Sequence, residues 1–546
     1  MRSRMRIYLK KNRSAVIIYG LFLFFMVLIV SSKNNYHVDE MFSFSLSNWN
    51  RNAFPVVDGK IYSPTEFYRQ WMAVSPEGRF DYGPVWLNQE KDVHPPLYYA
   101  LLHTLCSFTP GKIADWQPAV INFLFAFLSL WIFRRLLCLT GEEYLNCTEN
   151  SVLMNVASLA YIVLPGILNN VSFFRMYVMA MFIVTWISYL TIRIALCVQT
   201  GTLVPHRYWL ELFLASLFSA LTHYYCVMYL VFDEIVLFAY LLLKKRRKEP
   251  LLQVLVSMAA TAASVLIFPA MIRHILSSGR GVQVRGNFFD LSPTVYLDQI
   301  KAYYTFFDKS VAGGFPAMLL IAVILLCACR FVFALAVSSP VNDDREKDQP
   351  AQTSYSRHLL CLAFILIPSL LYYILLCRIT VMVSERYAFP LYTILFFAII
   401  LTIEIVLRHL RIRHKAFLVA TAFILASVLA GVYKEPKWQY LYRDDSLQYT
   451  ITDYCGLDCV VVYEKQFQIR SLYKETGCLN SITFIKKDDY DLLLKNGIAS
   501  SDDLILFAYE TDVAGELVQR LANVDKYEEI GKRTYFTVYH LFRDNG

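Results

Sequence analysis

Charged residues are scarce in this sequence. Asp, Glu, Lys and Arg make up 18% of its 546 residues, against 56% hydrophobic and 15% aromatic residues. This composition excludes a soluble globular protein, whose surface needs more charge. It is typical of a multi-pass membrane protein with one polar appendage, so a mainly α fold is expected.

The motifs of common cofactor and nucleotide sites are also missing. The sequence has no CxxC pair and no Cys/His spacing typical of zinc, and its C-terminal part has no GxGxxG, P-loop or paired-His signature. No nucleic-acid partner is expected. Most of the 12 cysteines lie in apolar runs, where they act as small hydrophobic residues. In the C-terminal part, a Cys455–Cys459 or a Cys459–Cys478 disulfide is compatible with an extracytoplasmic location.

Apolar runs alternate with basic clusters in a way that predicts about eleven membrane spans. Six basic residues precede the first run, so the N-terminus is expected in the cytoplasm and the first run is expected to be a retained anchor. The basic clusters at alternate run ends then fall on the same side, and the C-terminus lies outside. The shorter run Leu97–Phe108 would invert this pattern as a span, so an interfacial or half-inserted helix is expected there. The eleven runs are 15–30, 116–133, 151–168, 176–196, 208–222, 224–243, 251–272, 313–337, 358–377, 388–407 and 416–432.

A change in composition near residue 432 predicts two domains. Residues 1–432 form the transmembrane domain, which includes a first outer loop at about 31–94. In that loop the amphipathic stretch Thr65–Val74 is suited to a membrane surface. Residues 433–546 alternate short β-rich runs with helix-like stretches and are expected to form a small extracytoplasmic α/β domain. The strands are expected at Cys459–Tyr463, Ser481–Ile485, Leu504–Ala508 and Thr534–Phe542, and the helices at Tyr490–Lys495 and Val513–Leu521.

Several charged or polar residues fall at the outer ends of the expected spans. Asp39 and Glu40 follow the first span, with His37 just before them, and further segments supply His94, Arg175, His223 and Arg386. Each has a structural alternative, since an arginine can reach the headgroups and a histidine can cap a helix. Together, one acidic pair and several cationic candidates on one side of the membrane indicate a site for an anionic lipid headgroup.

A polyprenyl-phosphate sugar is a substrate that needs this set of residues. Its phosphate is already a competent leaving group, so the site needs cations to stabilise the developing charge, a role suited to Arg175 and Arg386. The acceptor hydroxyl needs one carboxylate base, which Asp39 supplies. A single displacement of this kind inverts the anomeric centre.

Five motifs in the same order resemble those of a known family. HVDEMFSFS (37–45), HPPLYYALLH (94–103), RMY (175–177), THYY (222–225) and ERYAFPLY (385–392) are similar to segments of bacterial membrane glycosyltransferases related to protein O-mannosyltransferases and the lipid A aminoarabinose transferase. The resemblance covers about 1–432 and implies a GT-C fold. Relatives often have an acidic residue two places before the RMY arginine, where this sequence has Phe173.

The resemblance also implies roles for single residues. Asp39 matches the catalytic base, with Glu40 as its partner, and His94, Arg175 and Arg386 match positions near the donor phosphate. Four further motif positions, His37, Tyr177, His223 and Tyr387, are expected to bind substrate. Some relatives use a divalent cation. The spacing of His37, Glu40, His94 and His223 does not establish a metal site, so no metal is assigned.

Three functions remain open at this stage. The first is an inverting transferase in a bacterial cell membrane, moving a sugar from a polyprenyl-phosphate donor to a wall polymer, glycolipid or protein outside the cytoplasm. The second is a carrier or flippase for a lipid-linked saccharide, for which the pair Asp233 and Glu234 within an apolar run is the best feature. The third is a non-catalytic subunit of polymer assembly, which leaves the arginines unexplained.

Overall fold

The computed structural model divides the chain into two compact units. Unit 1 contains Met1–Val30, Val93–Tyr98 and Ala119–Gln439, and unit 2 contains Ser31–Asp92, Tyr99–Pro118 and Tyr440–Gly546. Unit 2 therefore combines the segment after the first apolar run with the end of the chain, whereas the sequence suggested one boundary at 432. The structure describes residues 13–33, 35–48, 56–141, 152–290, 292–312, 349–409, 451–487, 489–494, 501–510, 512–533 and 535–544.

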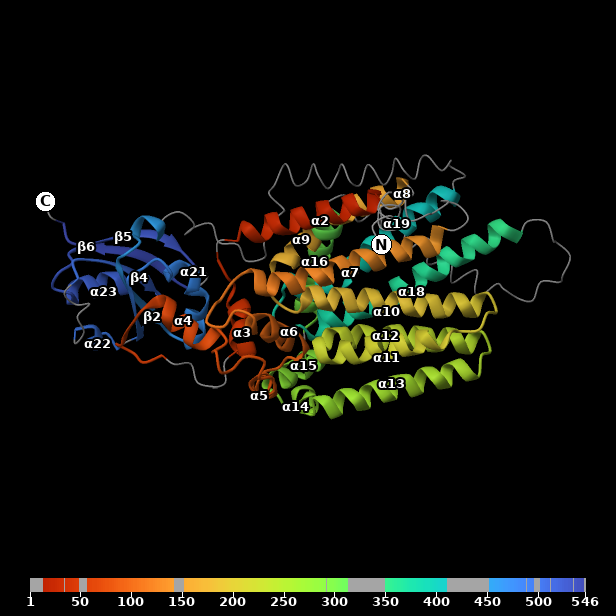
Figure 1. Cartoon of the computed structure of the whole chain (residues 1–546), viewed down its shortest axis with the longest axis horizontal. Helices are drawn as coiled ribbons and strands as arrows, with labels where there is room; N and C mark the ends of the chain where they lie inside the picture. Colours follow the sequence, from red (N-terminus) through yellow and green to blue (C-terminus); the bar gives the residue numbers. More distant parts are fainter. Residues whose placement is uncertain are drawn as a thin grey trace. The chain divides into compact units, whose positions relative to one another are not determined.

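In the residues that the structure describes, the regular elements of unit 1 are all helices. Its long helices run alongside one another, as Figure 1 shows for α10 to α13. Two short 3₁₀ helices, η1 and η2, connect α18 to α19. The elements are α2 (Arg13–Ser31), α7 (Trp116–Gly141, whose first residues belong to unit 2), α8 (Val152–Ile162), α9 (Pro165–Ser172), α10 (Tyr177–Gln199), α11 (His206–Thr222), α12 (Tyr224–Leu243), α13 (Lys248–Ile267), α14 (Ala270–Leu276), α15 (Gly279–Asp290), α16 (Pro293–Val311), α18 (Gln349–Ile379), η1 (Glu385–Tyr387), η2 (Phe389–Leu391) and α19 (Tyr392–His409).

Six of the described helices are long and apolar enough to cross a membrane, which makes the chain a multi-pass membrane protein. They are α2, α7, α10, α12, α13 and α18, and the pair α8 and α9, bent by 49°, raises the number to seven if it forms one span. The predicted run 388–407 forms a shorter apolar helix, and 208–222 forms the 17-residue α11. The predicted spans 313–337 and 416–432 lie outside the described residues.

Helix α10 lies at the centre of unit 1. It is apolar on all sides and almost all of it is buried, as expected for a helix surrounded by others. Its neighbours include α11, α12, α18 and α19. Helix α9 approaches α16 and α19 closely at Gly166, where a Cβ would lie 2.5 Å from the Tyr392 ring and 2.8 Å from Ser310. A larger side chain there would push α9 away from α16 and α19.

Unit 2 is built on a six-stranded sheet with the strand order β1-β3-β2-β4-β6-β5. The three central strands β3, β2 and β4 are parallel, and the outer pairings are antiparallel. The helix α6 spans the boundary between the units. The elements are α3 (Val38–Asn48), β1 (Ile61–Tyr62), α4 (Pro64–Met72), α5 (Gly83–Lys91), α6 (Leu97–Ser107), η3 (Ile451–Tyr454), β2 (Asp458–Tyr463), η4 (Gln466–Leu472), α21 (Tyr473–Thr476), β3 (Ser481–Lys486), α22 (Asp491–Leu494), β4 (Asp503–Ala508), α23 (Val513–Arg520), β5 (Lys526–Lys532) and β6 (Thr537–Phe542).

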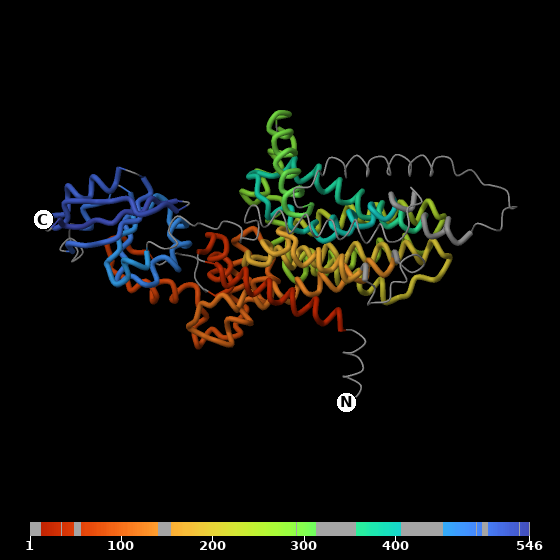
Figure 2. Tube along the Cα trace, turned by 90° about the horizontal axis from the view of Figure 1, so that it is seen from above, coloured from red at the N-terminus to blue at the C-terminus, as the bar shows by residue number. Residues whose placement is uncertain are grey.

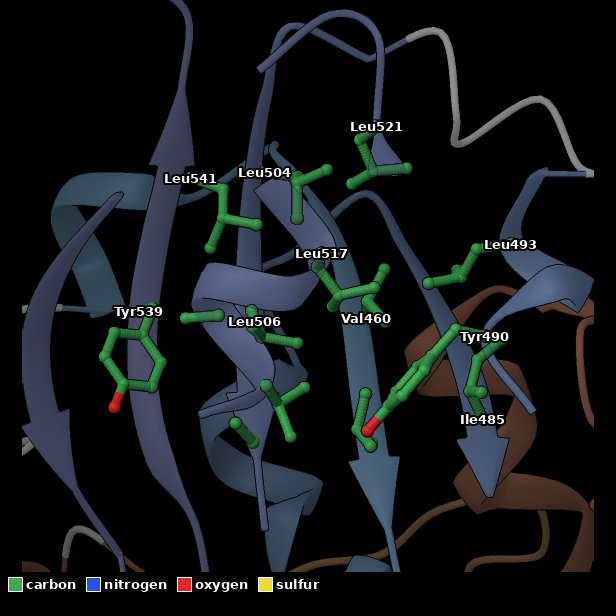
Figure 3. Close-up of a cluster of buried hydrophobic side chains, with 14 of the residues drawn as sticks. Val460, Ile485, Tyr490, Leu493, Leu504, Leu506, Leu517, Leu521, Tyr539 and Leu541 are labelled. Atoms are coloured by element: carbon green, nitrogen blue, oxygen red, sulfur yellow. The ribbon is translucent and has the colours of Figure 1, made fainter. Parts of the chain in front are cut away.

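One face of this sheet packs against α22 and α23. Figure 3 shows Leu517 of α23 and Leu493 of α22 over the strand residues Val460, Leu504 and Leu506, all of which are buried. These strands alternate apolar side chains between their two faces, so the sheet buries both of them. The four predicted strands and two predicted helices of this region are confirmed as β2, β3, β4, β6, α22 and α23.

The other face of the sheet receives α4 from the first loop. Phe67 lies 4.6 Å from Phe484 of β3 between ring centroids, and the Tyr68 hydroxyl donates a hydrogen bond of 2.8 Å to the Ile469 carbonyl. Both views show α4, in orange-red, beside the blue strands (Figures 1 and 2). The prediction that this amphipathic stretch lies on a membrane surface is wrong, because Phe67, Tyr68, Trp71 and Met72 are at most 1% exposed within unit 2.

The disulfide of unit 2 joins Cys455 and Cys478, whose Cα atoms are 5.0 Å apart. Both pairings suggested by the sequence are wrong, because each required Cys459. That residue is fully buried in the middle strand β2, between Ile482 and Ile505 of the neighbouring strands. The loops that carry the bonded cysteines meet at the strand ends, where the Gly456 amide donates to the Cys478 carbonyl at 3.0 Å.

Candidate functional site

The first part of the candidate site is the turn between α9 and α10, which carries Arg175. Two carbonyls at the end of α9, those of Val171 and Phe173, accept hydrogen bonds of 2.9 and 3.0 Å from the Asn122 amide. The Arg175 amide then donates to the Phe173 carbonyl at 2.7 Å, which closes the turn before α10 begins at Tyr177. This turn holds Arg175 in a buried position, 3% exposed.

His223 forms the second part, at the break between α11 and α12. Its backbone is extended, so it ends one helix and caps the next. The Nδ1 atom accepts a hydrogen bond of 3.1 Å from the Tyr225 amide, which places the proton of the neutral ring on Nε2. Within the described part of the chain, Nε2 is buried and has no hydrogen-bond partner. His223 therefore presents a buried N–H donor.

Arg386 forms the third part, in the 3₁₀ helix η1 between α18 and α19. The neighbouring Glu385 fixes this helix, because its carboxylate accepts hydrogen bonds from the Ser310 hydroxyl and, at 2.8 Å, from the Tyr392 hydroxyl. Burial raises the pKa of Glu385, and these two hydrogen bonds oppose that effect. The Tyr372 hydroxyl also donates to the Tyr387 carbonyl at 2.7 Å. These contacts hold Arg386 at 7% exposure.

The three parts meet at His223. Burial lowers the pKa of His223 well below its ordinary value, and the nearby charges of His94, Arg175 and Arg386 lower it further. The His94 ring is 5.6 Å from the His223 ring. Four residues from separate segments of unit 1, two of them arginines, are thus gathered into one group, hereafter the His223 cluster.

Tyrosine rings surround this cluster. The Tyr177 ring lies 5.4 Å from the His223 ring, and the Arg386 guanidinium lies 5.2 Å from the ring of Tyr387. The structure also brings in Tyr225, whose ring is 4.8 Å from His223 and 5.1 Å from Tyr387. Tyr225 was not among the site residues expected from the sequence, although it is the last residue of the THYY motif. Tyrosines of this kind combine apolar rings with hydroxyl donors.

The acidic candidates lie in unit 2, at the start of α3. Glu40 and Lys33 form an ion pair with 2.6 Å between Oε1 and Nζ, and both side chains are completely buried. Burial lowers the pKa of Lys33, an effect that the charge of Glu40 opposes. The second oxygen of Glu40 accepts a hydrogen bond of 2.7 Å from the His37 amide. Glu40 therefore stabilises the first turn of the helix from inside the protein.

Asp39 differs from Glu40 in its exposure. Its side chain is 25% exposed, and its nearer oxygen lies 3.7 Å from Nδ1 of His37. The Asp39 amide donates to the same Nδ1 atom at 3.2 Å. The sequence offered two adjacent acids as a catalytic pair. The structure places one of them in a buried ion pair and leaves the other accessible to solvent or substrate.

The candidate residues are therefore divided between the two units. His94, Arg175, Tyr177, His223, Arg386 and Tyr387 come together in unit 1, and His37, Asp39 and Glu40 come together in unit 2. The four histidine and glutamate positions that were considered for a metal are split in the same way. In the described residues, no group of three or more His, Cys, Asp or Glu side chains is arranged to hold a metal ion.

No protein-family model matches the sequence, and no curated protein matches it. Among solved structures, the chain is similar to two crystal structures of ArnT, the lipid A aminoarabinose transferase, from Cupriavidus metallidurans. The structure bound to undecaprenyl phosphate has a TM-score of 0.33 and 10% identity, with 97% of this chain and 98% of that chain covered. The apo structure has a TM-score of 0.36 and 10% identity, with 98% of both chains covered.

Proposed function

We propose that this protein is an inverting membrane glycosyltransferase. It moves a sugar from a polyprenyl-phosphate donor to an extracytoplasmic acceptor, which is a cell-wall polymer, a glycolipid or a protein. The observation that carries the proposal is that Arg175 and Arg386 are buried at the junctions of apolar helices, near His223, whose ring lies 5.6 Å from that of His94. A buried cationic group at the ends of membrane helices suits a phosphate on a lipid tail.

The His223 cluster supplies the electrostatic part of the reaction. As the bond between the anomeric carbon and the phosphate oxygen breaks, negative charge grows on the departing polyprenyl phosphate. The two guanidinium groups stabilise that charge, and their planar donors match phosphate oxygens. The Nε2–H of His223 adds a neutral donor. This stabilisation is stronger in a buried site than in water.

Asp39 takes the role of general base. The acceptor oxygen attacks the anomeric carbon, its proton passes to the Asp39 carboxylate, and the polyprenyl phosphate leaves with the bonding electron pair. Because one displacement occurs, the anomeric configuration inverts. The base must be accessible to the acceptor, and Asp39 is, whereas Glu40 is fully buried against Lys33. Glu40 therefore acts as a structural partner in this proposal.

The proposed topology is the eleven-span arrangement with a cytoplasmic N-terminus and unit 2 outside, in a bacterial cell membrane. The basic clusters at alternate helix ends support it. The Cys455–Cys478 disulfide supports an oxidising compartment for unit 2, since disulfides persist outside the cytoplasm. Attachment of a membrane-impermeant thiol reagent after reduction tests this topology. Labelling of Cys455 and Cys478 from the cytoplasmic side alone would contradict it.

Transfer by the purified protein in vesicles tests the function. The assay contains a polyprenyl-phosphate sugar and a mixture of envelope acceptors, and NMR of the product gives its anomeric configuration. We expect inversion, and we expect Asp39→Asn to lower the transfer rate by about 10²- to 10⁴-fold while the thermal unfolding midpoint is unchanged. A retained configuration, or full activity of the variant, would contradict the mechanism.

A carrier for lipid-linked saccharides is the second candidate. Asp233 in α12 favours it: this carboxylate is fully buried in an apolar helix, and within the described residues neither of its oxygens has a hydrogen-bond partner. Intramembrane acids often serve transport. Vesicle experiments separate the two functions. Translocation without transfer, lost in Asp233→Asn and kept in Asp39→Asn, would favour the carrier.

A further inference from the structure

We propose that Arg470 and Lys474, from the C-terminal part of unit 2, are positioning residues that hold the Asp39 segment in its reactive geometry. The inference rests on the proposed function, in which Asp39 is the base. It gives the C-terminal part a task in the reaction, although Asp39 and these two residues are more than 400 positions apart in the sequence. The contacts on both sides of Asp39 carry the argument.

Lys474 holds the chain before Asp39. Its ammonium group donates to the Lys33 carbonyl at 2.9 Å and to Oδ2 of Asp115 at 2.9 Å. It also lies 4.6 Å from the centre of the Tyr36 ring, which stacks on the ring of Tyr473. Tyr36 is only 2% exposed. Lys33 and Tyr36 are therefore fixed against α21.

Arg470 holds the chain after Asp39. Its guanidinium lies over the ring of Phe42, 3.9 Å from the centroid, and 5.2 Å from that of Trp71 in α4. Phe42 is three residues after Asp39 on α3, so the two side chains lie on neighbouring turns of the same helix face. Burial lowers the pKa of Arg470 to about 10, so the group stays cationic at neutral pH and can interact with both rings.

Lys33 transmits one of these contacts to the first turn of α3. The backbone of Lys33 is held by Lys474, and its side chain pairs with Glu40, the residue directly after Asp39. Asp39 thus lies between two points of attachment to the C-terminal part, while its own carboxylate stays partly exposed. Loss of either attachment moves the carboxylate without removing it. Displacement of about 1 Å in a catalytic group costs about 100-fold in rate.

Kinetics of full-length protein in vesicles test the proposal. The variants Arg470→Met and Lys474→Met keep the apolar stems, which favours normal folding. We expect kcat to fall about 10- to 100-fold in each, while KM for the polyprenyl-phosphate sugar changes less than about twofold, because the donor-binding cluster is untouched. The kcat of Arg470→Lys is expected to be nearly as low as that of Arg470→Met, since an ammonium group lacks the planar face that stacks on Phe42 and Trp71.

Arg520→Met is the matched control. Arg520 lies on α23 of the same unit, where it contacts Asp491 at 3.2 Å and Glu516 at 2.7 Å and is 40% exposed. The activity of Arg520→Met is expected to equal that of the unaltered protein. An equal loss of kcat in Arg520→Met would show a general structural effect and overturn the proposal. A rise in KM as large as the fall in kcat in Arg470→Met and Lys474→Met would do the same. Unchanged kcat in both Met variants would also overturn it.

A second measurement separates this inference from the proposed function. Asp39→Asn reports on the base itself. If Asp39→Asn is inactive and the two Met variants are fully active, the positioning role fails and the transferase mechanism stands. If Asp39→Asn is fully active, the mechanism fails. Should a Met variant unfold, Phe42→Leu in α3 removes the same ring contact from the other side and is expected to give the same fall in kcat.

Discussion

The buried ion pairs of unit 2 and the His223 cluster of unit 1 handle buried charge in opposite ways. Unit 2 pairs it: Lys33 with Glu40 at 2.6 Å and Arg533 with Glu475 at 2.5 Å, all four side chains almost completely buried. Unit 1 gathers His94, Arg175 and Arg386 around His223, whose pKa is lowered by burial and by interactions with these neighbours. Opposite charges in contact stabilise a scaffold, whereas like charges held together favour an anionic ligand. We therefore infer that the buried ion pairs support the fold and that the His223 cluster binds an anionic ligand.

The largest expected effect comes from the two adjacent acids. Asp39→Asn should lower the transfer rate by about 10²- to 10⁴-fold, the usual contribution of a general base, without a change in stability. Transfer assays together with thermal unfolding measure both quantities. Substantial loss of stability in Asp39→Asn would remove the distinction between an accessible base and a buried structural acid.

Glu40→Gln should act mainly by lowering the stability of the protein. It leaves the Lys33 charge buried without its partner, which costs about 3–5 kcal/mol, and activity falls as a consequence. Chemical denaturation followed by tryptophan fluorescence measures the cost. The double variant Lys33→Met with Glu40→Leu is the control. It removes both charges and should recover most of the stability, because well-packed apolar side chains replace a buried ion pair at little cost.

Removing a cation from the His223 cluster should lower activity without lowering stability. Arg175→Met is expected to lower kcat about 10²- to 10³-fold, as loss of a transition-state donor does, while stability is unchanged or raised. Arg193→Met is a matched control on α10, since Arg193 contacts the Tyr189 hydroxyl and the Tyr208 ring within the helical unit. A stability loss in Arg175→Met with normal kcat would show that the cluster is structural.

The smallest expected effect concerns pH. A histidine whose pKa is lowered on folding binds fewer protons in the folded than in the unfolded state, so stability falls as pH drops below the ordinary value of about 6.5. Thermal unfolding of unaltered protein between pH 7.5 and 5 measures this trend. His223→Gln should reduce the slope. An identical slope in the variant would show that His223 does not titrate in this way.

Local patterns in the sequence predicted much of this fold. The central strands β2, β3 and β4 follow from short β-branched and aromatic runs. The strands β1 and β5 were missed, because β1 has two residues and β5, KYEEIGK, is polar and largely exposed. Edge strands are recognised by their partners more than by their own residues.

The candidate site was predicted less completely. Motif positions selected all four members of the His223 cluster, since charged or polar side chains at the junctions of membrane helices are unusual enough to notice. Tyr225, Arg470 and Lys474 were not selected. Tyrosine is common in this sequence, and a lysine or arginine in a polar region gives no local sign that its partner is Phe42 or Lys33.

The sequence by itself determined that this is a membrane protein, where most of its long apolar helices and its central strands lie, and which side chains are candidates for chemistry. Composition and periodicity are local properties, and they suffice for those conclusions. The tertiary structure alone decided that Glu40 is buried and Asp39 accessible, that Cys478 bonds to Cys455, and that α4 packs on the sheet. Burial and pairing depend on contacts between distant segments, such as the one between Lys474 and Lys33, which no local pattern encodes.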